Sequence, residues 1–181
     1  MFNRALGFVL VCLLAASSAF AHSAGVEAQL QARLVVLQAD GKESYRAADT
    51  AGPGAVVDYQ VTYSNRTGAP VAHVLATLPI PAGAMVYLPS SAKPVQVLTS
   101  IDGTTFAPTP LRRTVVNAQG ASVTQIVPVS EYRFLRWDLG TLAAGASSIV
   151  SARMKVIDAD TAASVSTTTN NTDSAVSGAR K

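Results

Sequence analysis

Residues 55–64 read AVVDYQVTYS, and this stretch decides the fold class. Its large apolar side chains occur at every second position, and most residues between them are polar. Because a β-strand turns successive side chains to opposite faces, this pattern predicts a strand with one buried face and one face toward water. β-Branched and aromatic side chains pack well on such a buried face. The predicted buried residues are Val57, Tyr59, Val61 and Tyr63.

Alternation of this kind recurs along the chain, and no segment after residue 21 shows the spacing of an amphipathic helix. Short strands separated by Gly, Pro, Asn and Asp turns predict an all-β fold, an antiparallel β-sandwich of about seven to eight strands. Trp137 is the only tryptophan and is the predicted core anchor. The other predicted strands are 30–38, 71–80, 95–101, 132–139 and 148–157.

Residues that favour turns lie between these predicted strands. An asparagine can hydrogen-bond within its own turn, and glycine tolerates the left-handed conformation, so the SNRTGAP segment predicts a tight turn. Proline lacks a backbone donor, which places LPIPAG at a strand end or a sheet edge. An Asp-Gly dipeptide after a strand predicts a hairpin. The predicted turn positions are Asn65, Gly68, Pro81, Gly83, Asp102, Gly103, Gly140 and Gly145.

The two ends of the 181-residue chain differ from its middle. Residues 1–21 combine Arg4, a short apolar run and small residues before a cleavage point after Ala21, which predicts a signal peptide and export. Cys12, the only cysteine, lies inside this segment, so the processed chain would hold no disulfide. We expect one domain over 22–157, a largely disordered tail over 158–181 rich in Ser, Thr and Asn, and no transmembrane anchor in the processed chain.

Several turn motifs in a fixed order point to a family. The PGAVVDYQVTYSN segment, the LPIPAG corner, SIDGTTFAP and LRWDLGTLAAGASS together resemble the bacterial conserved repeat domain, also called domain of unknown function eleven. The resemblance covers residues 50–157. It implies an immunoglobulin-like sandwich on exported or surface proteins, often in tandem, and it implies no catalytic residues. A single copy here argues against a simple role as a long stalk.

A copper site is the sharpest chemical hypothesis. Cleavage after Ala21 would make His22 the N-terminal residue, and its amine and imidazole could bind Cu(II) together with His73, the only other histidine. The simpler interpretation is that His73 lies on a strand surface and that His22 belongs to a loose leader. No serine-hydrolase elbow, zinc-protease helix or phosphate-binding loop occurs, so we predict no catalytic residues and a non-catalytic role.

Binding to a partner is the main functional hypothesis, and the partner is an unknown protein or envelope component in the periplasm or at the cell surface. Segments 87–94 and 109–120 are the best candidate binding loops, with Lys93, Arg112 and Arg113, although both segments could be plain connections. A carbohydrate-binding module would need exposed, coplanar aromatics among Tyr45, Tyr87, Phe106 and Tyr132. The formal charge of +3 without a basic stripe argues against nucleic acid.

Overall fold

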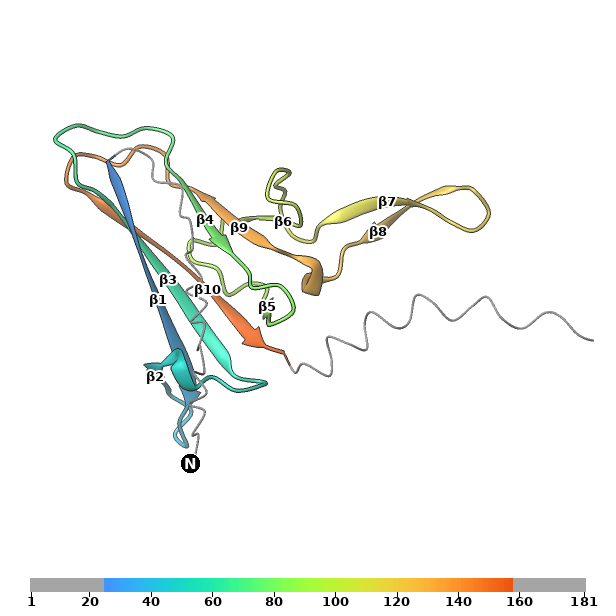
Figure 1. The fold of residues 1–181 in the computed structure, drawn as a ribbon, viewed down its shortest axis with the longest axis horizontal. Coiled ribbons are helices and arrows are strands. Elements are labelled where there is room, and N and C mark those ends of the chain that lie inside the picture. Colours follow the sequence, from blue (N-terminus) through green and yellow to red (C-terminus); the bar gives the residue numbers. More distant parts are fainter. Residues whose placement is uncertain (1–24, 158–181) are drawn as a thin grey trace, which may run out of the picture.

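A computed structural model describes residues 25–157, and they form two antiparallel sheets and a separate hairpin (Figure 1). The described residues contain no α-helix; they contain two short 3-10 turns, η1 (Ala48–Thr50) and η2 (Val129–Glu131). The strands are β1 (Val26–Leu37), β2 (Glu43–Ala47), β3 (Val56–Asn65), β4 (Leu75–Pro79), β5 (Met85–Tyr87), β6 (Leu98–Ser100), β7 (Arg112–Val116), β8 (Ser122–Ile126), β9 (Phe134–Asp138) and β10 (Ser147–Val156).

The larger sheet has the order β2-β1-β3-β10-β5, and all its pairs are antiparallel. The strand predicted from residues 55–64 lies at its centre as β3, where it pairs with β1 on one side and β10 on the other. Val57, Val61 and Tyr63 are buried as predicted, and Tyr59 is half-buried against the same core. The alternation in this stretch therefore identified the strand on which the sheet is built.

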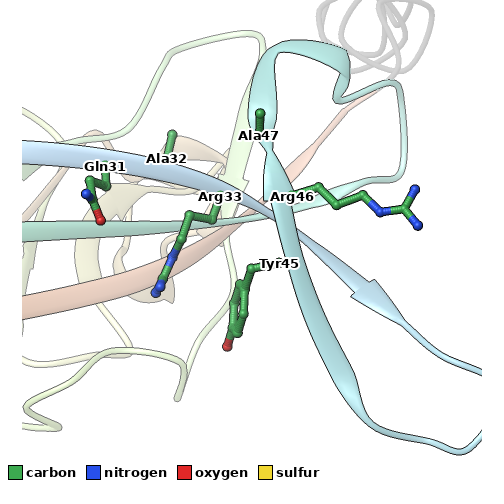
Figure 2. A pocket seen from close by; sticks show the side chains of 6 residues that line it. All are labelled: Gln31, Ala32, Arg33, Tyr45, Arg46 and Ala47. Carbon is green, nitrogen blue, oxygen red and sulfur yellow. The ribbon is translucent and has the colours of Figure 1, made fainter.

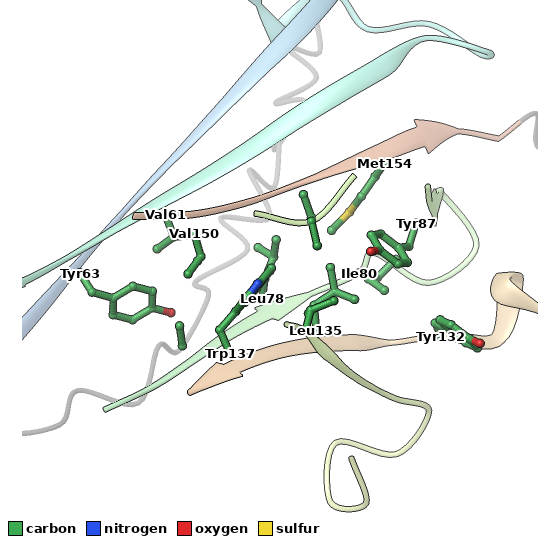
Figure 3. Close-up of a cluster of buried hydrophobic side chains, with 14 of the residues drawn as sticks. Val61, Tyr63, Leu78, Ile80, Tyr87, Tyr132, Leu135, Trp137, Val150 and Met154 are labelled. Atoms are coloured by element: carbon green, nitrogen blue, oxygen red, sulfur yellow. The ribbon is translucent and has the colours of Figure 1, made fainter. Parts of the chain in front are cut away.

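The smaller sheet, in the order β4-β9-β6, covers part of the inner face of the larger one. Figure 3 shows Val61 and Val150 from the larger sheet facing Leu78 and Trp137 from the smaller. Trp137 is 1% exposed, and its indole N–H donates a 2.9 Å hydrogen bond to the carbonyl oxygen of Pro94. The predicted antiparallel sandwich with Trp137 in its core is confirmed.

Asn65 joins two loops at one end of the sandwich. Its side-chain amide donates to the carbonyl oxygens of Ala69, Leu142 and Ala143 at 2.8, 2.9 and 3.0 Å, and its Oδ1 accepts the Thr67 amide at 2.9 Å. The predicted turn bond is present. The bonds to the carbonyls of Leu142 and Ala143 give Asn65 a role beyond its own turn, because they join two segments that are far apart in the sequence.

Most of the other turn predictions are confirmed. Gly83, Gly103, Gly140 and Gly145 all have positive φ, between 63° and 77°, where glycine is favoured. Pro79 ends the edge strand β4, and the carbonyl of Pro81 accepts the Met85 amide in the next turn. The prediction for Gly68 is wrong, because this residue does not adopt a positive φ and the Asn65 side chain closes the turn instead.

Three other expectations need correction. Segment 109–120, predicted as a loop, instead contains β7, which pairs with β8 to form a hairpin that projects from the sandwich (Figure 1). We call residues 111–127 the arm.

Asp102 and Gly103 do not form a two-residue hairpin turn; they lie in a wider loop that closes where Thr99 and Ala107 bond to each other. The first strand begins at Val26, four residues earlier than predicted.

No helix among residues 25–157 is long and apolar enough to span a bilayer. The predicted signal peptide, His22 and the predicted C-terminal tail lie outside the described residues.

Candidate functional site

A pocket of about 420 Å³ lies where the arm leaves the sandwich. One wall comes from the loop that follows β6, and the other comes from the first residues of β7 and the residue after β8. Pockets that hold ligands combine apolar walls with a few polar groups, and this pocket has both. We call it the arm-base pocket; its lining residues are Ile101, Asp102, Thr105, Ala107, Pro108, Pro110, Leu111, Arg112, Arg113 and Val127.

Backbone bonds fix both walls. Thr99 and Ala107 exchange hydrogen bonds of 2.8 and 3.0 Å, which closes the loop between them. The Leu111 amide donates a 2.9 Å bond to the Tyr132 hydroxyl, and the Val127 amide donates to the Leu111 carbonyl at 2.9 Å. Because Leu111, Val127 and Tyr132 are buried, the arm is held firmly at its root.

Asp102 shapes the loop wall. Its Oδ1 accepts the amides of Thr105 and Thr104, both at 2.8 Å, and the Ser100 hydroxyl at 2.9 Å. These bonds, led by the Thr105 amide, hold the pKa of Asp102 well below its usual range. The carboxylate therefore stays ionised at neutral pH and stabilises the turn. Because it carries no proton to donate, it is unsuited to act as a general acid.

The two arginines of the pocket have different roles. Arg113 makes a two-point ion pair with Glu131, with nitrogen–oxygen distances of 2.5 and 3.2 Å. Arg112 is exposed and makes no ion pair or side-chain hydrogen bond within residues 25–157. A planar guanidinium without a partner is suited to a carboxylate or another planar anion. Arg112 is therefore the cation of this pocket that is available to a ligand.

The structure brings together only some of the residues predicted as candidates. Asp102, Arg112 and Arg113 meet at the arm-base pocket. Lys93 does not; it is exposed in a different loop, where its backbone exchanges two 2.8 Å bonds with Ser151 of β10. His73 is also elsewhere, exposed before β4 with a φ of 55°, and not on a strand as predicted.

The described residues bear differently on the two alternative hypotheses, a metal site and a carbohydrate-binding surface. Within 25–157 no three His, Cys, Asp or Glu side chains cluster as metal ligands. The pairing of His22 with His73 stays a prediction, since His22 lies outside this range. Tyr87 and Tyr132 are each 1% exposed, so the four aromatics considered for carbohydrate binding do not form one flat surface.

A second polar cluster, which the sequence analysis missed, lies on the outer face of the larger sheet. Arg33, Asp58 and Arg153 occupy directly opposed positions on β1, β3 and β10. Arg33 Nη2 lies 2.7 Å from Asp58 Oδ2, and Arg153 binds Glu43 through two bonds of 2.7 and 2.6 Å. The hydrogen bonds between Arg153 and Glu43 raise the pKa of Arg153 and lower the pKa of Glu43. The sequence shows one of these charged residues in each of three predicted strands, but it does not show the register that places the three side by side.

An open pocket of about 390 Å³ adjoins this cluster where β2 separates from β1 (Figure 2). Figure 2 shows Arg33 and Tyr45 extending to the same side of the strands, with the Arg33 guanidinium 4.5 Å from the centre of the Tyr45 ring, while Arg46 extends away. Arg33, Glu43 and Arg153 are already bound to one another or to Asp58. The cluster therefore fastens β2 to the sheet, and it leaves fewer free polar groups than the arm-base pocket.

Comparison of the chain with protein-family models, curated proteins and solved structures finds no match. The resemblance to the conserved repeat domain therefore stays a prediction from the sequence motifs.

Proposed function

We propose that this protein is an exported, non-catalytic interaction module of the bacterial envelope and that it binds its partner at the arm-base pocket. The observation that carries the proposal is the position of this pocket between a rigid sandwich and a projecting arm. Loops and hairpins held by rigid sheets are common binding surfaces.

The lining of the pocket indicates the chemistry of the partner. Ile101, Pro108 and Pro110 are exposed apolar walls, and Arg112 stands beside them as a cation that forms no ion pair within 25–157. A segment that presents an apolar side chain next to an acidic group would satisfy both features. We therefore propose an acidic, extended protein segment as the ligand.

Export is supported by the first 21 residues, which have the charge, apolar run and small residues of a signal peptide. N-terminal sequencing of the protein recovered from the periplasm or the medium tests this part. A chain that begins at His22 supports it, and an unprocessed chain confined to the cytoplasm contradicts it.

Site-specific photo-crosslinking tests the binding surface. A photoreactive amino acid replaces Ile101, which is 41% exposed and lines the pocket, or Leu37, which is 71% exposed at the end of β1. In the bacterium that makes the protein, we expect a discrete crosslinked species from position 101 and not from position 37. Equal labelling from both positions, or none from position 101, contradicts the proposal.

A charge reversal then tests the role of Arg112. Arg112→Glu should remove most of the crosslink from position 101, because it would repel the acidic segment. Arg46→Glu is the matched control, since Arg46 is also exposed and also lacks an ion pair within the described residues but lies at the other pocket. The same loss from both variants would show that net charge, and not this pocket, attracts the partner.

A further inference from the structure

The free edge of β8 is unusual for a soluble protein. Its five residues, Ser122–Ile126, carry no charge and no proline, and Ile126 is 59% exposed. Edge strands are normally protected from pairing by charges, prolines, bulges or a covering segment. The two cations of the arm, Arg112 and Arg113, lie on the other strand, β7. Within 25–157, β8 pairs with β7 alone.

The hydrogen bonds at the two ends of the arm fix which backbone groups face outward. The Val127 amide bonds to the Leu111 carbonyl, and the Asn117 amide bonds to the Ala121 carbonyl, both at 2.9 Å. In an antiparallel pair, positions that bond to the partner alternate with positions that do not. With the register Thr114 opposite Thr124, the amides and carbonyls of alternate β8 residues therefore point away from β7. These residues are Ser122, Thr124 and Ile126.

We propose that a second copy of this chain docks on that edge, with the two β8 strands antiparallel and Thr124 at the two-fold axis. Thr124 then lies opposite Thr124 of the second copy, and Ser122 lies opposite Ile126 of the second copy. Every opposed residue is one whose backbone groups point outward, so each pair can exchange both of its hydrogen bonds. The contact uses the same surface on both copies, as closed two-fold symmetry requires.

Charge selects this edge over the other one. Pairing through β8 gives a four-stranded sheet in which the strands that meet are neutral and the arginines lie on the two outer strands. Pairing through β7 would bring Arg112 of both copies, which forms no ion pair within 25–157, onto the joined strands, whereas Arg113 is already paired with Glu131. Like charges on neighbouring strands are unfavourable, so β8 is the edge that tolerates a second copy.

This contact goes beyond the proposed function and does not depend on it. Residues 122–126 do not line the arm-base pocket, so a dimer through β8 leaves both pockets open. The association is weak, because two five-residue strands bury much less than the roughly 1,200 Å² of a stable interface. It would present two pockets on one particle, which strengthens binding to a repeated partner.

Crosslinking tests the edge and the register together. All versions carry Cys12→Ala, which removes the only natural cysteine. In Thr124→Cys, the two thiols lie across the axis, where opposed Cα atoms are about 5.5 Å apart, within reach of a short bis-maleimide. We expect a covalent dimer from Thr124→Cys and little from Thr114→Cys, the matching exposed position on β7. A dimer from Thr114→Cys alone, equal dimer from both, or no dimer at all overturns the proposal.

Proline substitution provides a second, independent measurement. Thr124→Pro removes an outward amide and leaves the bonds to β7 intact, and Thr114→Pro does the same on the opposite edge. In sedimentation equilibrium, the association constant of Thr124→Pro should fall by at least about tenfold, while that of Thr114→Pro stays near the parent value. A monomeric parent at every concentration, or the same change in both variants, overturns the proposal.

Discussion

The amide of Leu111 donates a 2.9 Å hydrogen bond to the hydroxyl of Tyr132, and both residues are buried. This bond joins the start of the arm to the segment that enters β9. An isolated two-stranded hairpin is only marginally stable in water, so an arm of this kind depends on its root. The position of the arm-base pocket depends on the same bond.

Removal of this hydroxyl should loosen the arm. Tyr132→Phe leaves a buried amide without its partner and should lower the free energy of unfolding by about 1–3 kcal/mol. Urea denaturation measures the loss, and amide hydrogen exchange should show faster exchange at Leu111. Tyr45→Phe is the control, since its hydroxyl is exposed and lies 3.4 Å from Arg153. Equal losses from the two variants would contradict a special role for Tyr132.

Replacement of Asn65 should weaken the end of the sandwich where its side chain joins two loops. Asn65→Ala removes the three side-chain bonds to the carbonyls of Ala69, Leu142 and Ala143 and takes the side-chain acceptor from the Thr67 amide, so it should cost about 1–3 kcal/mol of unfolding free energy. Asn65→Asp should cost more at neutral pH, because a carboxylate would face those oxygens. Protonation restores one donor, so the deficit of Asn65→Asp should shrink as pH falls. A deficit that grows toward acid pH would contradict this account.

The Asp102 turn predicts a dependence of stability on pH. The folded pKa of Asp102 is lowered, led by the amide bond from Thr105, so its stabilisation is complete above the unfolded pKa, about 4. That stabilisation is lost as pH falls further toward the folded value. Between about pH 4 and pH 2, the melting temperature of Asp102→Asn should therefore change less with pH than that of the parent chain. Asp49→Asn controls for net charge; if it flattens the curve equally, the assignment to Asp102 is wrong.

In the polar cluster on the outer face of the larger sheet, a substitution at the central residue Asp58 should lower stability more than one at the edge residue Glu43. Asp58→Asn removes the carboxylate shared by Arg33 and Arg153, whereas Glu43→Gln removes only the more exposed partner of Arg153. The side chain of Asp58 is 10% exposed and that of Glu43 is 39% exposed, so solvent screens Glu43 more. Denaturation should show the larger loss for Asp58→Asn. The reverse order would contradict the central role of Asp58.

The sequence predicted those parts of the fold in which one strand face is buried and the other is not. The strands containing Tyr63, Trp137 and Met154 are of this kind, because burial imposes alternation on them. The arm was missed because both faces of β7 and β8 meet water around Thr114 and Thr124, and no apolar alternation is then needed. Its visible signal was the turn NAQG between two runs rich in Val and Thr.

The candidate site was only partly predictable for a related reason. Arg112 and Arg113 were identified as surface candidates, but their meeting with Asp102 depends on the bridge between Thr99 and Ala107, and no local motif marks that bridge. The ladder through Asp58 likewise depends on strand register. Register is set by the pairing of distant segments, which a single sequence does not display.

The tryptophan reports most directly on the central claim that alternate side chains are enclosed between two sheets. Trp137 is the only tryptophan, so the fluorescence of the native protein comes from one indole, which is 1% exposed. We predict blue-shifted emission that acrylamide and iodide barely quench until urea unfolds the chain. Emission of the native protein at the wavelength of a water-exposed indole, with full quenching by iodide, would contradict the sandwich and the pocket built on it.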